Sequence, residues 1–576
     1  MEKIYLSNST NPCEELIYNC IEGIASKKMV IFCGAGISMH SGLPLANDFV
    51  LDVLKKMDVS KQDSEILLNA NLPFESFMEV LIQDNYTSSF FDIFDIGEPN
   101  TNHLLIAKLA KLGYLKTICT TNFDRLIEVA LDREGMIRGQ DYKVFYEENH
   151  FARIDWDDGD YLHLIKIHGS IEDKGSMAVT LHRVASRAYS SNKNKIIEYI
   201  FSEGPHKSVV IMGYSCSDLF DISPAIQSLS KKHKDVYFIE HILLTGNRDG
   251  GWAEDIAIKD CKNPFQHFSG SNRIFYDTDE LMKKIWISCI DEEYKFISKY
   301  GTQSWKKFLD KALEEAEERY TKTYKHSVIG SIFSSISYFD IATKYFEKAL
   351  NVAREIGDLK QIGNCLGDIG VSYFHLGDFI KALMYYLEAV QAAEAIGDKR
   401  AKSKQLCNLS IAQQSVGEFQ MSLNYSMAAL KICRELGDEQ GEEANIGNIV
   451  NSFMELGEYK SAISCAEKAL DISRKIGNKE GETNHLSAIG NAYRNLGDYE
   501  KAMQYLEDAL AVAKKIGYQK GIGLCLGNIG NVHKSSGNLE MAQGFYREAL
   551  FIVKPLLGDK SYYTLMIENN IKNISE

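Results

Sequence analysis

Apolar positions in the C-terminal half of the chain recur at helical spacing and repeat every 40 residues. In residues 497–517, six of them fall on one stripe of a helix: Ala502, Tyr505, Leu506, Ala509, Leu510 and Ala513. Two interleaved series of glycines follow such runs at a period of 40, with one slip to 41: Gly357, Gly397, Gly437, Gly477, Gly517 and Gly558, and Gly377, Gly417, Gly457, Gly497 and Gly537. A glycine just past a periodic run is typical of a left-handed helix C-cap. The pattern predicts two helices in each 40-residue unit.

Small residues keep the same register. Alanine followed by leucine or valine recurs at Ala349, Ala389, Ala429, Ala469, Ala509 and Ala549. A single helix hairpin cannot bury its own apolar face, so the units must stack into a solenoid. The pattern resembles the long-helix, roughly 40-residue variety of tetratricopeptide repeat (TPR). We expect an all-α TPR superhelical solenoid over residues 325–576, with Ser337 at the glycine position of a degenerate first unit, and a helical linker over residues 291–324.

The first 290 residues have a different pattern, in which β-rich apolar runs alternate with helical stretches. The apolar runs are MVIFC, LKTICTT, LHLIKIH, SVVIMGY and VYFIEHILL. This alternation predicts an α/β Rossmann-like doubly wound parallel sheet with helices on both faces, over residues 1–290. In such a sheet, ligands bind beyond the carboxyl ends of the strands.

Composition narrows the class of protein. No apolar run approaches the roughly 20 residues of a membrane span. The start, MEKIYLSNSTNPCEE, lacks the apolar segment of a signal peptide, so we expect a cytoplasmic protein that does not enter the membrane. The formal net charge of −15 disfavours nucleic acid as a partner. The 12 cysteines stand singly, without C-x-x-C pairs, so we expect reduced thiols and no metal site.

The first candidate motif is MVIFCGAGISMHSGLP. A buried strand ends at Cys33, and the turn at Gly34, Ala35 and Gly36 presents backbone amides that suit a pyrophosphate. Met39 stands where the dinucleotide fingerprint requires its third glycine. A tight turn without a ligand is therefore an equal alternative.

Two further motifs follow predicted strands. In LKTICTTNFD, Asn122 stands where a helix N-cap would lie and Asp124 in the first turn, which indicates either capping or an amide presented to a ribose or a water. In SVVIMGYSCSD, Gly213 and Ser215 lie in a strand-to-helix loop and Asp218 begins the next helix. This loop could hold a ribose or adenine, or could be an ordinary turn.

The remaining motif is DYLHLIKIHGSI. Strand alternation places His163 on one face, where we assign it a structural role, and His168 on the other, at the strand end. A histidine at that point can act as a general base, although a hydrogen-bonded structural histidine is an equal alternative.

The ordered set of motifs is more specific than any one of them. G-A-G-x-S with S-G-x-P, then T-N-x-D, K-x-H-G-S and G-Y-S-x-S-D resemble the sirtuin superfamily over about residues 15–230, and the T-N-F-D form resembles its bacterial sirtuin-like branch. The resemblance implies NAD as the substrate, with its nicotinamide–ribose bond broken by a catalytic pair, Asn122 and His168. The implied NAD-binding residues are Gly34, Ala35, Gly36, Ser38, Asn122, Asp124, Gly213, Ser215 and Asp218.

Two departures from the deacylase pattern bear on the nucleophile. The four-cysteine zinc module is absent, and LANDF follows S-G-L-P where typical deacylases carry F-R. Water is then favoured over an acyl-lysine, which predicts an NAD+ hydrolase that releases nicotinamide and ADP-ribose. The alternatives are an NAD-dependent protein deacylase and a TPR scaffold that binds NAD or ADP-ribose without turnover.

The fusion of such a domain to a repeat array resembles bacterial antiphage effectors that deplete NAD. The resemblance implies an array that regulates the enzyme through a protein partner or trigger on its surface, and a homo-oligomer.

Overall fold

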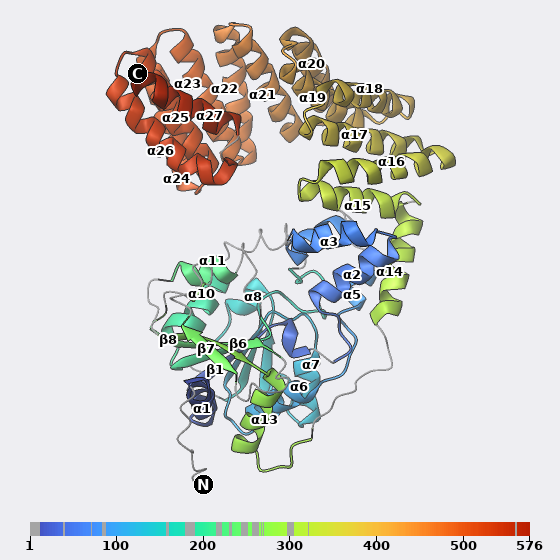
Figure 1. Cartoon of the computed structure of the whole chain (residues 1–576), viewed down its shortest axis with the longest axis vertical. Helices are drawn as coiled ribbons and strands as arrows, with labels where there is room; N and C mark the ends of the chain where they lie inside the picture. The colour runs from blue at the N-terminus through green and yellow to red at the C-terminus, as the bar shows by residue number, and fades with distance from the viewer. Residues whose placement is uncertain are drawn as a thin grey trace. The chain divides into compact units, whose positions relative to one another are not determined.

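The chain divides into two compact units, Met1–Ile332 and Phe333–Glu576, in the computed structural model (Figure 1). The structure describes residues 12–38, 41–70, 72–82, 88–156, 160–178, 191–214, 222–229, 233–242, 251–255, 264–265, 268, 270–295, 305–320, 322–558 and 561–575. Across these residues, none of the helices is both long and apolar enough to span a membrane.

A sheet forms the centre of the first unit. Its described strands are β1 (Met29–Cys33), β2 (Thr117–Thr120), β3 (Tyr142–Phe145), β4 (Leu162–Lys166), β5 (Ser208–Met212), β6 (Asp235–His241), β7 (Trp252–Asp255) and β8 (Gly270–Tyr276). They lie in the order β3-β4-β2-β1-β5-β6-β8-β7, and all neighbours are parallel except β7 and β8. From β1, the chain continues to β2 on one side of the sheet and later returns to β5 on the other side. The topological switch point therefore lies at β1, which is flanked by β2 and β5.

The predicted parallel α/β sheet is confirmed, and the five apolar runs form β1, β2, β4, β5 and β6. The same pattern misses β3, β7 and β8. Their sequences, YKVF, WAED and GSNRIFY, contain only short apolar runs, because these strands lie toward the two sides of the sheet rather than in its buried centre.

Helices cover both faces of the sheet. The described helices of the first unit are α1 (Pro12–Ala25), η1 (Ala35–Ser38), α2 (Ala46–Lys56), α3 (Lys61–Asn69), α4 (Phe74–Ile82), α5 (Ser88–Asp92), α6 (Thr101–Lys111), α7 (Leu126–Arg133), α8 (Glu148–Phe151), α10 (Ser191–Glu198), the π-helix η2 (Tyr199–Glu203), α11 (Ile222–Gln227), α13 (Thr278–Cys289) and α14 (Trp305–Tyr320). Alternate strand residues point to opposite faces. Ile31 and Met212 belong to a core with α1, α6, α7 and α13, whereas Phe32 and Ile211 belong to a core with α10, η2 and α11.

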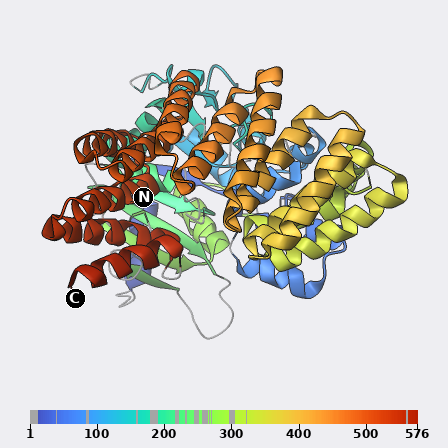
Figure 2. The ribbon, with the colours of Figure 1, turned by 90° about the horizontal axis from the view of Figure 1, so that it is seen from above.

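The second unit is a series of antiparallel helix pairs (Figures 1 and 2). After α15 (Tyr324–Ser335), which contains the boundary between the units, its helices are α16 (Phe339–Ile356), α17 (Leu359–His375), α18 (Phe379–Ala395), α19 (Lys399–Ser415), α20 (Phe419–Leu436), α21 (Glu439–Glu455), α22 (Tyr459–Ile476), α23 (Lys479–Asn495), α24 (Tyr499–Lys515), α25 (Gln519–Ser535), α26 (Leu539–Leu557) and α27 (Tyr562–Ser575). The predicted pair of helices per 40 residues is confirmed.

Glycines lie at the ends of these helices because the backbone there has a positive φ. The ten glycines of the two series from Gly357 to Gly537 have φ between +67° and +86°, and a Cβ built at any of them meets nothing within 4 Å. There is room for a side chain at these positions, so glycine is favoured there by the left-handed backbone conformation and not by close packing. Ser337, at the equivalent place in the first unit, takes φ +64° without being glycine.

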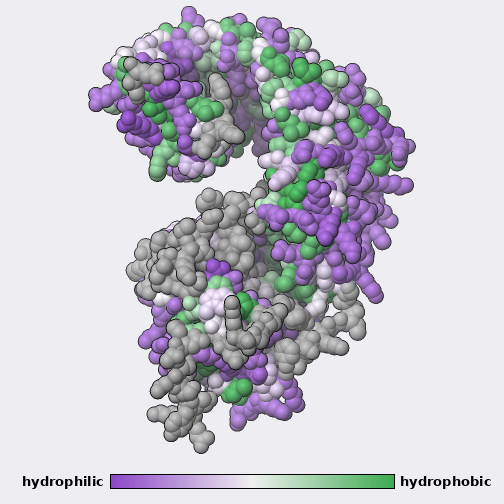
Figure 3. All heavy atoms as spheres, viewed as in Figure 1, coloured by the Kyte–Doolittle hydropathy of each residue, from purple (hydrophilic) through white to green (hydrophobic). Residues whose placement is uncertain are grey.

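Small side chains set the spacing of the helix pairs. The six register alanines, Ala349 to Ala549, are all fully buried. Helices of the array pack mainly against their neighbours in the sequence, and less extensively against helices next but one. The face of the array visible in Figure 3 is mainly hydrophilic, with hydrophobic side chains scattered across it.

Candidate functional site

The carboxyl ends of four strands lie level with one another at the switch point. Cys33 at the end of β1 is in register with Thr120 of β2 and Met212 of β5, and Thr120 is in register with Lys166 of β4. The residues that follow these strands therefore emerge at one edge of the sheet. All four sequence motifs reach that edge, which is the position where doubly wound sheets bind ligands.

The turn after β1 packs directly on the turn after β5. The amide of Gly34 donates to the carbonyl of Met212 at 2.9 Å, and the amide of Gly36 donates to the carbonyl of Gly213 at 2.9 Å. A Cβ on Gly34 would lie 2.3 Å from the carbonyl oxygen of Gly213, and a Cβ on Gly36 would lie 2.6 Å from its Cα. These glycines allow two backbone segments to approach closely. Protein carbonyls already accept from the amides of Gly34 and Gly36, and the binding of a pyrophosphate by this turn stays a prediction.

Ser38 is the centre of a buried hydrogen-bonded cluster. Its Oγ lies 3.2 Å from Nε2 of His103, accepts from Nδ2 of Asn122 at 3.1 Å, and donates to Oδ2 of Asp124 at 3.3 Å. All four side chains are buried. Three of them come from two separate motifs, so the fold joins the β1 and β2 motifs through a single hydroxyl.

His103 enters the cluster from the first turn of α6. The amide of Asn100 donates to its Nδ1 at 3.2 Å, and the side chain of Asn100 caps the same helix and donates to the carbonyl of Ile37 at 2.7 Å. Burial lowers the pKa of His103 to about 3, so its imidazole is neutral at physiological pH. Sequence reasoning missed this residue. The spacing N-x-x-H from Asn100 to His103 is that of a helix capping box, and this pattern could have indicated the residue.

Asn122 does not cap a helix. Helix α7 begins only at Leu126, and Oδ1 of Asp124 accepts from the amide of Leu126 at 3.0 Å. The capping alternative for Asn122 is therefore wrong, and Asp124 bonds the first helical amide instead. The Oδ1 atom of Asn122 is buried and has no hydrogen-bond partner among the described residues. Buried amide oxygens are nearly always bonded, so this atom is suited to accept from a bound molecule.

The two histidines of the third motif have different surroundings. His163 is buried between aromatic rings, stacked on Phe145 and Trp156, and its Nε2 contacts the carbonyl of Asp155 at 3.0 Å. These contacts agree with a structural role. His168 follows β4, is 7% exposed, and its ring centroid lies 6.2 Å from that of Phe123, the residue after Asn122.

A buried ion pair lies at the same edge of the sheet. Lys166, at the end of β4, contacts Glu128 of α7 at 2.8 Å. Burial raises the pKa values of Asp124 and Glu128, while the Lys166 ammonium acts in the opposite direction on both. The sequence pattern contains this lysine within K-x-H-G-S, but nothing local assigns it a role.

Two predicted residues, Ser215 and Asp218, lie outside the described residues. Gly213, in the same motif, has φ +67° and directly contacts the β1 turn. In the described ranges, no group of three or more His, Cys, Asp or Glu side chains is arranged to hold a metal ion.

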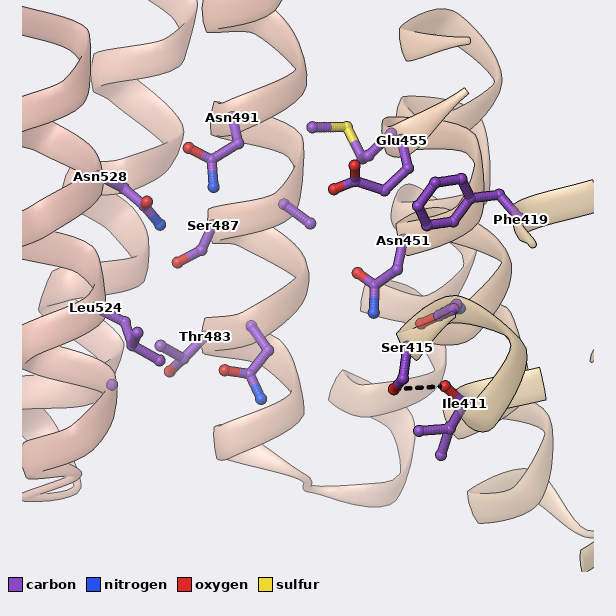
Figure 4. A pocket seen from close by; sticks show the side chains of 15 residues that line it. Ile411, Ser415, Phe419, Asn451, Glu455, Thr483, Ser487, Asn491, Leu524 and Asn528 are labelled. Atoms are coloured by element: carbon purple, nitrogen blue, oxygen red, sulfur yellow. Dashed lines mark hydrogen bonds between the residues drawn. The ribbon is translucent and has the colours of Figure 1, made fainter. Parts of the chain in front are cut away.

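The repeat array contains a groove of its own (Figure 4). Its volume is about 640 Å³, and its walls come from α19, α21, α23 and α25, with Phe419 at the start of α20. Uncharged polar side chains are prominent in the lining. Among them Asn451 and Asn491 occupy the same place in successive 40-residue units, and Figure 4 shows them on neighbouring helices. The buried Oδ1 of Asn491 has no hydrogen-bond partner in the described part of the chain.

Comparison with known families identifies the class of each unit. The SIR2-like domain family matches residues 116–259, and the tetratricopeptide repeat family matches residues 339–395, 361–435 and 442–515. The chain thus carries a SIR2-like domain followed by tetratricopeptide repeats.

Individual relatives are similar to part of the chain. It is 27% identical over 217 residues to NAD(+) hydrolase ThsA of Bacillus cereus (strain MSX-D12), covering 36% of this chain and 41% of that protein. It is 25% identical over 211 residues to NAD(+) hydrolase ThsA of Acinetobacter baumannii (strain 532279), covering 35% and 39%. It is 30% identical over 135 residues to an NAD-dependent protein deacetylase of Clostridium perfringens (strain 13 / Type A), covering 22% and 47%. Each of these matches spans less than half of the relative's length.

Proposed function

We propose that the SIR2-like unit is an NAD+ hydrolase that releases nicotinamide and ADP-ribose, with Asn122 and His168 as its catalytic pair. The observation that carries the proposal is the buried Oδ1 of Asn122 near the switch point of the sheet, which has no hydrogen-bond partner in the part of the chain that the structure describes. A polar atom in that state is suited to hold a ribose hydroxyl or a water, both of which can donate to it.

The reaction needs little more than positioned polar groups. Water attacks C1′ of the ribose that carries nicotinamide, the C1′–N bond breaks, and its electron pair goes to nicotinamide, which leaves neutral. The proton lost by the water passes to His168, whose ring lies near Phe123. Asn122 orients the water or the ribose. The carboxylate of Asp124, held by Ser38 and by the amide of Leu126, supports positive charge developing at the ribose.

The remaining part of NAD would lie along the same edge. The β1 turn at Gly34, Ala35, Gly36 and Ser38 and the β5 turn at Gly213 would line it, with Ser215 and Asp218 assigned to the adenosine half by resemblance. The amides of Gly34 and Gly36 already donate to protein carbonyls. We therefore propose that the backbone of this turn lies against the phosphates without using these two amides as donors. Asp124 would lie on the nicotinamide side.

A second activity is supported by the deacetylase relatives, which are also similar to part of this chain. An NAD-dependent deacylase would use an acyl-lysine oxygen in place of water at the same ribose carbon. Incubation with an acetyl-lysine peptide and NAD+ separates the two. O-acetyl-ADP-ribose indicates deacylation, and ADP-ribose formed without peptide indicates hydrolysis.

The biological proposal is an antiphage effector that depletes NAD when a partner or trigger engages the array. The groove of α19, α21, α23 and α25 supports a protein partner, since its amide side chains can both donate and accept hydrogen bonds, as a peptide main chain requires. A homo-oligomer in the cytoplasm is part of the same proposal, with assembly as one route to activation.

The test is NAD+ loss and nicotinamide release by the purified wild type, Asn122→Ala and His168→Ala, over a range of protein concentrations. His233→Ala is the matched control, because that histidine is solvent-exposed. Turnover by the wild type and the control, but by neither active-site variant, supports the proposal. A steep rise in specific activity with concentration supports assembly. Turnover that survives both Asn122→Ala and His168→Ala would refute the catalytic pair, and NAD+ binding without turnover would favour the scaffold.

A further inference from the structure

Lys166 is a fully buried cation at the end of β4. Strand alternation places it on the same face as Leu162 and Leu164, toward the core that contains α7. Burying an ammonium group is strongly unfavourable unless its donors are satisfied. The surroundings of this side chain therefore have to supply several acceptors.

The acceptors come from one loop and the helix that follows it. Nζ of Lys166 contacts Oε1 of Glu128 at 2.8 Å, donates to the carbonyl of Asp124 at 2.5 Å, and donates to the carbonyl of Phe123 at 3.3 Å. An ammonium group has three protons, so all its donors are used. Two of the three bonds end on the loop between β2 and α7, which also carries Asn122.

The same loop is fixed at another point. The amide of Ile171 donates to the carbonyl of Phe123 at 3.0 Å. Lys166 and Ile171 lie on either side of His168 in the sequence, so both bonds tie the loop to the segment that carries this histidine.

We propose that Lys166 is a positioning residue. It holds the loop of residues 121–125 against the end of β4, and so sets the place of Asn122 relative to His168. The inference rests on the proposed function, in which these two side chains form the catalytic pair. Lys166 acts through main-chain carbonyls and does not touch the substrate. A displacement of about 1 Å in such a pair is enough to reduce turnover on the order of 100-fold.

A simpler alternative is that Lys166 only neutralises Glu128. The two roles differ in what a double variant does. Lys166→Met/Glu128→Gln removes both buried charges while keeping the side chains close to their original volumes, so we expect the fold to be retained. Both loop carbonyls nevertheless lose the Lys166 ammonium as a donor, and that of Phe123 keeps the amide of Ile171.

The chain offers a matched control at the amino-terminal edge of the sheet. Lys234 is 2% exposed, immediately precedes β6, and donates to the carbonyls of Gly204 and Tyr199 at 2.8 and 3.5 Å. Lys234→Met also removes a buried lysine bonded to two carbonyls, but at the amino end of a strand rather than the carboxyl end.

The experiment compares wild type, Lys166→Met/Glu128→Gln, Lys166→Met and Lys234→Met in the full chain. The readouts are kcat and KM for NAD+ and amide hydrogen exchange of the peptide covering residues 121–126. We expect kcat of the double variant to fall roughly 10- to 100-fold with KM changed less than about 3-fold, and loop exchange to rise at least about 10-fold. Lys234→Met should leave kcat and loop exchange within about 3-fold of wild type.

Three results would overturn the inference. These are wild-type kcat in the double variant, unchanged exchange of residues 121–126, or an equal fall in kcat with Lys234→Met. If the wild type itself does not consume NAD+, the proposed function fails, and loop exchange alone then decides whether Lys166 positions the loop.

Discussion

Replacement of Ser38 by alanine tests whether the buried cluster is one connected unit. The substitution removes the Oγ shared by His103, Asn122 and Asp124, at distances of 3.2, 3.1 and 3.3 Å, and leaves three buried polar groups short of a partner. A buried polar group left unsatisfied costs roughly 1–3 kcal/mol. Two of the three keep another bond, since His103 retains its contact with Asn100 and Asp124 retains the amide of Leu126. We therefore expect Ser38→Ala to lower the free energy of unfolding by about 2–3 kcal/mol.

The assay can observe the first unit separately. All four tryptophans of the chain, Trp156, Trp252, Trp286 and Trp305, lie within residues 1–332, so tryptophan fluorescence during urea unfolding reports on that unit. Ser26→Ala is the control, because its hydroxyl is exposed and donates to the carbonyl of Gly23. A change within about 0.5 kcal/mol is expected there. If Ser38→Ala were as stable as Ser26→Ala, the cluster would not be a connected hydrogen-bonded unit.

Three further predictions concern other parts of the chain. Ser337→Gly should stabilise the array by about 1 kcal/mol and Gly497→Ser should destabilise it by a similar amount, because both residues have positive φ. The midpoint of urea unfolding, followed by circular dichroism at about 222 nm, measures both changes. Equal midpoints in wild type and variants would contradict the prediction. Because the pKa of His103 is about 3 when folded and near 6.5 when unfolded, the unfolded chain takes up the proton first, and stability falls as pH falls below about 6.5. His103→Gln should remove about 2 kcal/mol of the difference in unfolding free energy between about pH 7 and pH 5, and the same pH dependence in wild type and variant would argue against a buried neutral imidazole. Asn491→Arg places a long cationic side chain in the groove of the array. It should abolish NAD+ loss in phage-infected cells without changing the circular dichroism spectrum. Undiminished NAD+ loss would exclude the groove as the partner site.

Local patterns were sufficient for the repeat array and for the centre of the sheet. The helix pairs depend on a 3.6-residue period and on glycines whose φ is positive, and both features are properties of neighbouring residues. The buried parallel strands are equally visible, since they are apolar on both faces. The convergence of the four motifs could also be predicted, because all of them follow such strands.

The contacts inside the site could not be predicted in the same way. Asn122 follows β2 as a capping residue would, but the carboxylate of Asp124 takes the amide of Leu126, so the helix begins later than expected. His103 lies 65 residues from Ser38, and Lys166 lies 38 residues from Glu128. Each of these bonds depends on how α6 and α7 pack beside the sheet, which no local period encodes. The hydrogen bonds of the Gly34 and Gly36 amides could not be predicted either, because the carbonyls that accept from them come from β5 and the turn after it.

The equal spacing of the array has an evolutionary consequence. Gly437 and Gly477 end equivalent helices with φ of +67° and +75°, and the residues after them, Asp438 and Asn478, both cap the next helix. Unequal recombination that removed or duplicated the 40 residues between these points would rebuild the same junction. Since most contacts reach only nearby helices, the rest of the array would be unaffected. The groove can therefore gain or lose whole 40-residue units during evolution, independently of the SIR2-like unit.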